Sequence, residues 1–253
     1  MSLHRFHVPA AAPGARVSLP DHAAHHARDV LRLRVGAPAR IFDGAGNEWD
    51  GVLEEVSRRS VSARLLHAVE ARPESPLRLA LAMAALKGDR MELVIQKATE
   101  LGDAQIWPVV TLRTDAAARP ALDGSRSERW ERVASGAAEQ CGRAVVPHIA
   151  PTTTLDGLIA RPFDGARAVL LETPGHQALA SVAIGPGVPL LLLVGPAGGF
   201  EAAEAGALLA AGFVAASLGP RVLRAETAAV AAVTIAQATW GDLGAVASSA
   251  KTG

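Results

Sequence analysis

Glycines and arginines follow three strand-like segments in the second half of the sequence. The segments are LLETPGH (170–176), LVGPAGGF (193–200) and SLGPRVLRAET (217–227). Gly195, Gly198 and Gly199 separate an apolar run from a helix expected to begin near Glu201. Glycine allows a ligand to approach the backbone closely, and helix N-termini present free N–H groups. The pattern predicts a ligand site, although taken alone it fits an ordinary glycine turn equally well.

Common catalytic motifs are absent from these loops. GPAGGF does not match G-x-G-x-x-G, no glycine loop continues into G-K-[ST], and G-x-S-x-G does not occur. The sequence therefore supports neither a Rossmann dinucleotide site, nor a triphosphate-binding P-loop, nor the hydrolase nucleophile elbow.

A histidine cluster near the N-terminus is the only pattern that suggests a metal. His22, His25 and His26 have helical spacing, but no carboxylate or cysteine at ligand spacing accompanies them. The pattern favours a solvated or RNA-facing helix, and we predict no metal site.

Composition bounds the class of protein. The 253 residues are 49% hydrophobic, which is ample for a buried core, and the single cysteine, Cys141, excludes an internal disulfide. Apolar runs are too short and too interrupted by glycine to span a membrane, and no signal peptide is evident. We expect a cytoplasmic protein. With 25 basic and 25 acidic residues, nucleic-acid binding cannot be argued from net charge.

The distribution of strands predicts two domains. Short apolar segments between Gly, Pro and Asn breaks indicate a small β-barrel or sandwich with one helix, DHAAHHARDVLRL, before the proline-containing linker ARPESP. Strands then alternate with helices, which predicts a mostly parallel sheet covered on both faces.

Two helices in this second part have clear signals. Met91, Leu93, Val94, Ala98 and Leu101 form an amphipathic pattern that Gly102 ends. A later helix is expected to begin with the capping pair Ser125 and Glu128 and to end at Gly142.

Separated motifs carry a resemblance over nearly the whole chain. HRFHV, HHARDVLRLRVG, KGDRMELVIQKATELG, EQCGR, LLVGPAGGF and LGPRVLRAETA occur in this order. Together they resemble the bacterial family that methylates N3 of a uridine in 16S ribosomal RNA, in the SPOUT superfamily. The resemblance implies a PUA-like RNA-binding barrel (1–72), a linker (73–76), a SPOUT α/β domain with a C-terminal trefoil knot (77–246) and a flexible tail (247–253).

The resemblance also implies S-adenosylmethionine (SAM) as cofactor and a homodimer. The partner is 16S rRNA in the 30S subunit or in a late assembly intermediate. Carried over by motif, the cofactor-binding residues are Leu171, Glu172, Gly195, Pro196, Gly198, Gly199, Leu218, Gly219, Leu223 and Thr227. The alanine-rich helix from Ala225 suits close packing and agrees with a dimer.

Arginines are the expected catalytic and RNA-binding groups. N3 of uracil loses a proton when it is methylated, and Arg143 and Arg224 are predicted to stabilise the charge that develops on the base. A structural ion pair with Glu100 or Glu139 is an equally open interpretation of Arg143. The residues expected to bind RNA are Arg5, His26, Arg32, Arg34 and Arg221.

One departure from the family pattern leaves alternatives open. The loop usually reads G-P-E-G-G, whereas this chain has Ala197 at the acidic position, and Glu201 and Glu204 are the nearby carboxylates. A non-catalytic RNA-binding assembly factor therefore remains an alternative. So does a SPOUT enzyme that methylates tRNA or a ribose 2′-hydroxyl.

Overall fold

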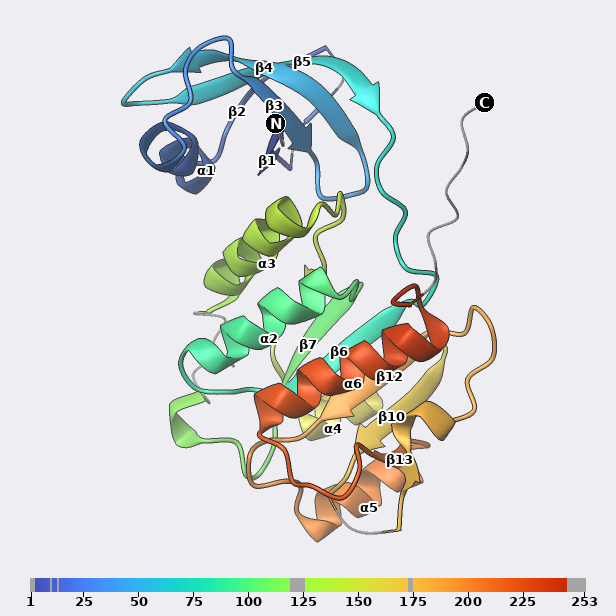
Figure 1. Cartoon of the computed structure of the whole chain (residues 1–253). Helices are drawn as coiled ribbons and strands as arrows, with labels where there is room; N and C mark the ends of the chain where they lie inside the picture. Colours follow the sequence, from blue (N-terminus) through green and yellow to red (C-terminus); the bar gives the residue numbers. More distant parts are fainter. Residues whose placement is uncertain (1–2, 10, 13, 119–125, 173–174, 245–253) are drawn as a thin grey trace. The chain divides into compact units, whose positions relative to one another are not determined.

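The computed structural model describes residues 3–9, 11–12, 14–118, 126–172 and 175–244 (Figure 1). The chain forms two compact units: Met1–Glu74 with Ala134–Val146, and Ser75–Val133 with Pro147–Gly253. They divide between Glu74 and Ser75, within the stretch expected as a linker. The inclusion of 134–146 in the first unit was not expected from the sequence. Within the described part of the chain, no helix is long and apolar enough to cross a membrane.

The first unit is built on a five-stranded sheet in the order β1-β3-β4-β5-β2. The strands are β1 (His4–His7), β2 (Arg16–Ser18), β3 (Pro38–Phe42), β4 (Glu48–Val56) and β5 (Val61–Val69). β1 and β3 are parallel and the other pairs are antiparallel. Over the described residues the two edge strands, β1 and β2, do not pair with each other, so the sheet is not closed into the barrel that the family resemblance implies. Its core includes Phe6, Ile41, Trp49 and Leu53.

The expected N-terminal helix changes type along its length. α1 (Asp21–His25) continues as the π-helical turn η1 (His26–Val30). Arg32 follows with φ +53°, a left-handed conformation that is costly for a side chain with a Cβ. This conformation ends the helix and leaves the Arg32 side chain exposed.

The second unit contains an eight-stranded parallel sheet. Its order is β11-β13-β10-β12-β6-β7-β8, and β9 also pairs with β7. The strands are β6 (Leu79–Ala84), β7 (Gln105–Val110), β8 (His148–Ile149), β9 (Thr153–Thr154), β10 (Ala166–Leu170), β11 (Gln177–Ala178), β12 (Leu190–Val194) and β13 (Val214–Ser217). All residues of β6 and β12 are buried, which explains their uninterrupted apolar sequences.

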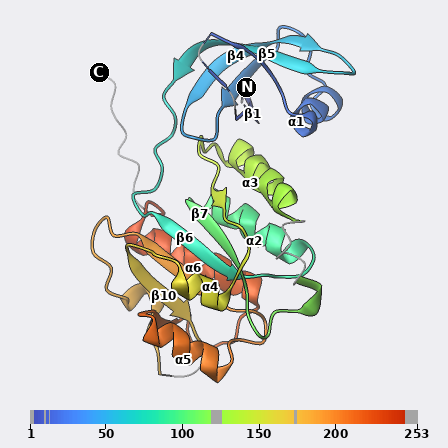
Figure 2. The same ribbon diagram turned by 180° about the vertical axis from the view of Figure 1, so that it is seen from behind.

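Helices cover both faces of this sheet. The helices of this unit are α2 (Asp89–Glu100), α4 (Leu155–Ala160), the short 3-10 helix η3 (Leu179–Ser181), α5 (Ala202–Ala210) and α6 (Ala225–Trp240), whereas α3 (Ser127–Cys141) begins in this unit and ends in the first. α2 and α6 lie on the face seen in Figure 1, and Figure 2 shows α4 on the opposite face. α3 ends before Gly142, which has φ +89°, as expected. The predicted cap Ser125 lies outside the described residues.

Two expectations about helix faces require correction. The buried stripe of α2 is Met91, Val94, Ile95 and Ala98, whereas Leu93 is 42% exposed because it lies outside this i, i+3, i+4, i+7 pattern. The buried alanines of α6 recur at Ala225, Ala229, Ala232 and Ala236. α6 packs on α2 and on the central strands within the unit. Packing inside one chain therefore accounts for these small residues, and they are not evidence for a dimer.

Candidate functional site

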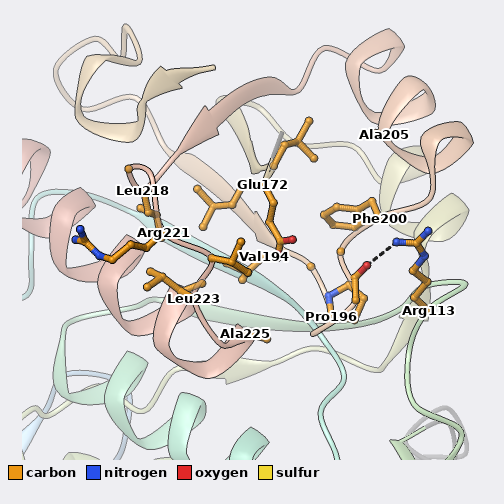
Figure 3. A pocket seen from close by; sticks show the side chains of 18 of the residues that line it. Arg113, Glu172, Val194, Pro196, Phe200, Ala205, Leu218, Arg221, Leu223 and Ala225 are labelled. Atoms are coloured by element: carbon orange, nitrogen blue, oxygen red, sulfur yellow. Dashed lines mark hydrogen bonds between the residues drawn. The ribbon is translucent and has the colours of Figure 1, made fainter. Parts of the chain in front are cut away.

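A pocket of about 370 Å³ lies at the carboxyl ends of β10, β12 and β13 (Figure 3). These strands are neighbours in the order β13-β10-β12, so the loops that follow them meet at one edge of the sheet. The residues that line it are Arg113, Leu170, Leu171, Glu172, Val194, Gly195, Pro196, Gly198, Gly199, Phe200, Ala202, Ala205, Leu218, Gly219, Pro220, Arg221, Val222, Leu223, Ala225 and Ala228.

Glycine is required at particular points of these loops. A Cβ at Gly195 would lie 2.8 Å from the Phe200 ring. Gly199 and Gly219 have φ of +66° and +101°, which residues with a Cβ rarely adopt. The pocket therefore exposes backbone between apolar side chains. In Figure 3, Glu172 lies between Leu223 and Phe200, while the Arg221 guanidinium points away from them.

The structure brings together most residues that the sequence assigns to cofactor binding. Of the ten, Thr227 alone is missing from the lining. It is exposed on the first turn of α6, whereas Ala225 and Ala228 on the same helix face the pocket.

Arg113 is a lining residue that the sequence analysis missed. It follows β7 by three residues, and its Nη1 donates a hydrogen bond of 2.6 Å to the Gly198 carbonyl (Figure 3). A signal was available, because the apolar run QIWPVV that becomes β7 favours a strand, and parallel strands direct their carboxyl ends to one edge. Sequence alone did not place that end beside the glycine loop.

The two predicted catalytic arginines have different surroundings. The side chain of Arg143 is 11% exposed, and its Nη2 lies 2.6 Å from Glu74 Oε2. Glu74 was not among the partners expected from the sequence. Arg143 also accepts a 2.8 Å hydrogen bond from Arg5 on its backbone carbonyl. These contacts give Arg143 a structural use within the first unit, and it does not line the pocket.

Arg224 is the exposed residue at the N-cap of α6. It lies between Leu223 and Ala225, both of which line the pocket, but is not itself in the lining. Within the described residues, its side chain forms no hydrogen bond or ion pair. A cation therefore remains available beside the pocket.

The residues predicted to bind RNA occupy several positions. Arg221 lines the pocket of the second unit. Arg5 and His26 line a cavity of about 970 Å³ in the first unit, whereas Arg32 and Arg34 are exposed outside it. Arg5 forms an ion pair with the buried carboxylate of Glu48, and its guanidinium stacks 4.9 Å from the Phe42 ring.

The same cavity contains Glu139 from α3. Its Oε1 accepts a 2.8 Å hydrogen bond from the His7 backbone N–H. Burial raises the pKa of Glu139 to about 7, although the His7 hydrogen bond and the Arg5 charge act in the opposite direction. Burial also lowers the pKa of His7.

The described residues contain no cluster of three or more side chains that could ligate a metal ion.

The raised pKa predicts that stability depends on pH through Glu139. Between its ordinary value of 4.5 and about 7, the folded chain retains a proton that the unfolded chain releases. The free energy of unfolding therefore falls as pH rises through this window. Glu139→Gln keeps an acceptor for His7 and should be more stable than the unmodified chain at about pH 8, by about 1–3 kcal/mol, but not at about pH 4.

Urea denaturation of both proteins across a pH series measures this difference. Glu131→Gln changes the net charge equally at an exposed position of the same helix and serves as the control. Parallel pH profiles for the unmodified chain and Glu139→Gln would show that the Glu139 carboxyl does not titrate in this window.

Comparison with known proteins defines the class of protein to which this chain belongs. A model described as an RNA methyltransferase domain matches residues 73–237, and one described as an RNA methyltransferase PUA domain matches residues 19–66. Ribosomal RNA small subunit methyltransferase E of Synechocystis is 33% identical, over 87% of this chain and 72% of the relative. The Bacillus subtilis protein of the same name is 31% identical, over 83% and 85%. This chain therefore belongs to the ribosomal RNA small subunit methyltransferase E family.

Solved structures agree with this assignment. A methyltransferase E structure from Neisseria gonorrhoeae, bound to SAM, superposes with a TM-score of 0.84 at 32% identity, covering 95% of this chain and 99% of the other. A Legionella pneumophila protein, solved in complex with SAM, has a TM-score of 0.89 at 33% identity, covering 96% and 100%.

Proposed function

We propose that this protein transfers a methyl group from SAM to N3 of a uridine in 16S rRNA. The observation that carries the proposal is the pocket at the ends of β10, β12 and β13, which the sequence predicted from its glycine loops. The similar proteins of known structure that were solved with SAM support the choice of cofactor.

The residues of the pocket fit the cofactor. Glycine backbone at Gly195, Gly198 and Gly199 leaves room for close approach, because a Cβ at Gly195 would displace a ring that borders the pocket. Leu218 and Leu223 offer apolar surface to a purine ring, and Glu172 offers a carboxylate to hydroxyl or ammonium groups. SAM, when bound, supplies a methyl group on a sulfonium ion.

The protein must expose the uracil edge and assist loss of its N3 proton. N3 is hidden in a base pair, so the base must be unpaired or flipped. As the proton leaves, negative charge spreads to O2 and O4 of the ring. Arg224, which has no ion-pair partner among the described residues, is the group that we assign to this charge.

RNA recognition rests on local cations. The net charge of +0 gives little long-range attraction to phosphate. Arg32 and Arg34 are exposed and without ion-pair partners in the described part of the chain, so they suit phosphate contacts, as does Arg221. We assign Arg5 and His26 to the RNA side as well, through the cavity of the first unit. An assembled 30S subunit or a late intermediate is the expected substrate, since shape must supply the specificity.

The finer features of the family belong to the same proposal. They are SPOUT threading of the C-terminal segment through a trefoil knot, a cytoplasmic location and a homodimer. The dimer rests on the family resemblance, since the alanines of α6 are used within the chain. Light scattering of the purified protein should give about twice 26.0 kDa, and a 26.0 kDa particle at micromolar concentration would contradict it.

Mass spectrometry of nucleosides tests the reaction. 30S subunits that lack the modification are incubated with the protein and isotopically labelled SAM, and the 16S rRNA is digested. We expect label in 3-methyluridine at one position, seen also as a stop of reverse transcriptase. Label in another nucleoside or in tRNA would identify a different RNA methyltransferase. SAM binding without methylation of any RNA, or no SAM binding, would favour an assembly factor.

A further inference from the structure

Arg113 connects the loop after β7 to the glycine loop of the pocket. Its Nε donates a 2.8 Å hydrogen bond to Glu201 Oε1, and its Nη1 donates a 2.6 Å hydrogen bond to the Gly198 carbonyl. A planar guanidinium can hold two acceptors in one fixed relation, which a single ammonium group does less well. Arg113 thus joins the carbonyl of the loop to the N-cap residue of α5.

The loop that carries Arg113 is itself held in place. Thr111 N–H donates to Thr114 Oγ1 at 2.9 Å, and Leu112 N–H donates to Glu204 Oε1 at 2.8 Å. The other oxygen of Glu204 accepts from the Glu201 N–H at 2.9 Å. Glu204 is 7% exposed, so one buried carboxylate accepts hydrogen bonds from both the loop after β7 and the N-terminus of α5. The Arg113 backbone is therefore fixed, although 45% of its side chain is exposed.

Besides Arg113, the Gly198–Gly199 peptide is held by one backbone hydrogen bond within its own loop. Gly198 and Gly199 have no side chains, and glycine populates both signs of φ at little cost. Because a peptide unit is planar, a hydrogen bond to the Gly198 carbonyl also orients the Gly199 N–H, which donates to Pro196 O at 2.9 Å. Ala197 adds no charge to this loop, so its anchoring carboxylates come from Glu201 and Glu204.

We propose that Arg113 is a positioning residue that holds the Gly198–Gly199 peptide in the conformation that lines the SAM pocket, with Glu201 as its anchor. The inference rests on the proposed function for its role in SAM binding. The geometry of the loop itself does not depend on that function.

Two measurements on Arg113→Ala test this role. We expect SAM binding, measured by calorimetry, to weaken about fivefold, as for loss of a charged hydrogen-bonding group. Without cofactor, hydrogen–deuterium exchange in the peptide covering 195–204 should become about tenfold faster. Arg113→Lys should weaken SAM binding less, and speed hydrogen exchange less, than Arg113→Ala does. Arg129→Ala is the matched control, because Arg129 is also exposed and forms an ion pair of 2.6 Å with Glu92.

A double-mutant cycle tests the anchor. If Arg113 acts through Glu201, Arg113→Ala combined with Glu201→Ala should weaken SAM binding little more than Arg113→Ala alone. Additive losses would contradict the anchoring role.

The possible failures are distinguishable. The positioning role would be overturned if hydrogen exchange and SAM affinity of Arg113→Ala stayed within twofold of the unmodified protein. It would also be overturned if Arg129→Ala had effects equal to those of Arg113→Ala. Absence of SAM binding by the unmodified protein would overturn the proposed function, while hydrogen exchange would still decide whether Arg113 orders the loop.

Discussion

Arg224→Ala is expected to slow methyl transfer about a hundredfold while SAM affinity stays nearly unchanged. Removing one preorganised donor to developing charge costs on the order of 10²–10³ in rate. Arg224 lies beside the pocket lining and, within the described residues, its side chain has no other partner. Its loss should therefore affect the chemical step more than the fold. Single-turnover rates with saturating SAM measure the effect.

The pH dependence separates this role from a structural one. At higher pH more of the uracil is already deprotonated, so the deficit of Arg224→Ala should become smaller as pH rises. Arg143→Ala is the comparison, because Arg143 is engaged with Glu74 at 2.6 Å. We expect it to lower the melting temperature by several degrees, on the order of 1–3 kcal/mol. Equal loss of SAM binding and of rate in Arg224→Ala would remove Arg224 from the chemical step.

Gly195→Ala is expected to weaken SAM binding by roughly 10- to 100-fold. The added Cβ would lie 2.8 Å from one atom of the Phe200 ring and 3.2 Å from two others. Phe200 packs against a buried cluster that includes Leu193 and Leu208 and also lines the pocket, so we expect the displaced ring to shift toward the pocket. Overpacking of this kind costs about 1–3 kcal/mol, which gives the expected range.

Gly206→Ala is the matched control for this prediction. Gly206 lies within α5, and a Cβ there would meet nothing within 4 Å. Alanine should therefore raise stability by about 1 kcal/mol through helix propensity, and SAM affinity should stay unchanged. Calorimetric titration of both variants with SAM measures the contrast. Unchanged affinity in Gly195→Ala would show that Phe200 does not border the bound cofactor.

The glycine loops of the pocket could be located from the sequence because their signals are local, whereas the set of cofactor-binding residues came from the family resemblance. Gly195 directly follows the apolar run that becomes β12, with Gly198 and Gly199 in the same loop, and Gly219 lies in the loop that follows β13. Chain neighbours on a strand end remain neighbours in space, whatever the order of the strands. The same local logic predicted the end of α2 near Gly102 and the end of α3 before Gly142.

The features that the sequence did not predict depend on contacts between residues that are far apart in the chain. Arg113 meets Gly198 across 85 positions, and this contact requires β7 and β12 to flank β6. Arg143 meets Glu74 across 69 positions, because the second half of α3 belongs to the first unit. Hydrophobic periodicity identifies a strand or a helix face but does not state its partner. The open edges of the first sheet were missed for the same reason.

The position of β6 in the sheet has a consequence for synthesis of the chain. β6 pairs with β7 on one side and with β12 on the other, and roughly a hundred residues separate Ala84 from Leu190. At about 5–20 residues per second, the ribosome completes β12 roughly 5–20 s after β6. During that interval one edge of a fully apolar strand has no partner, and such edges promote aggregation. The nascent chain should therefore need chaperone protection until residue 194 has emerged.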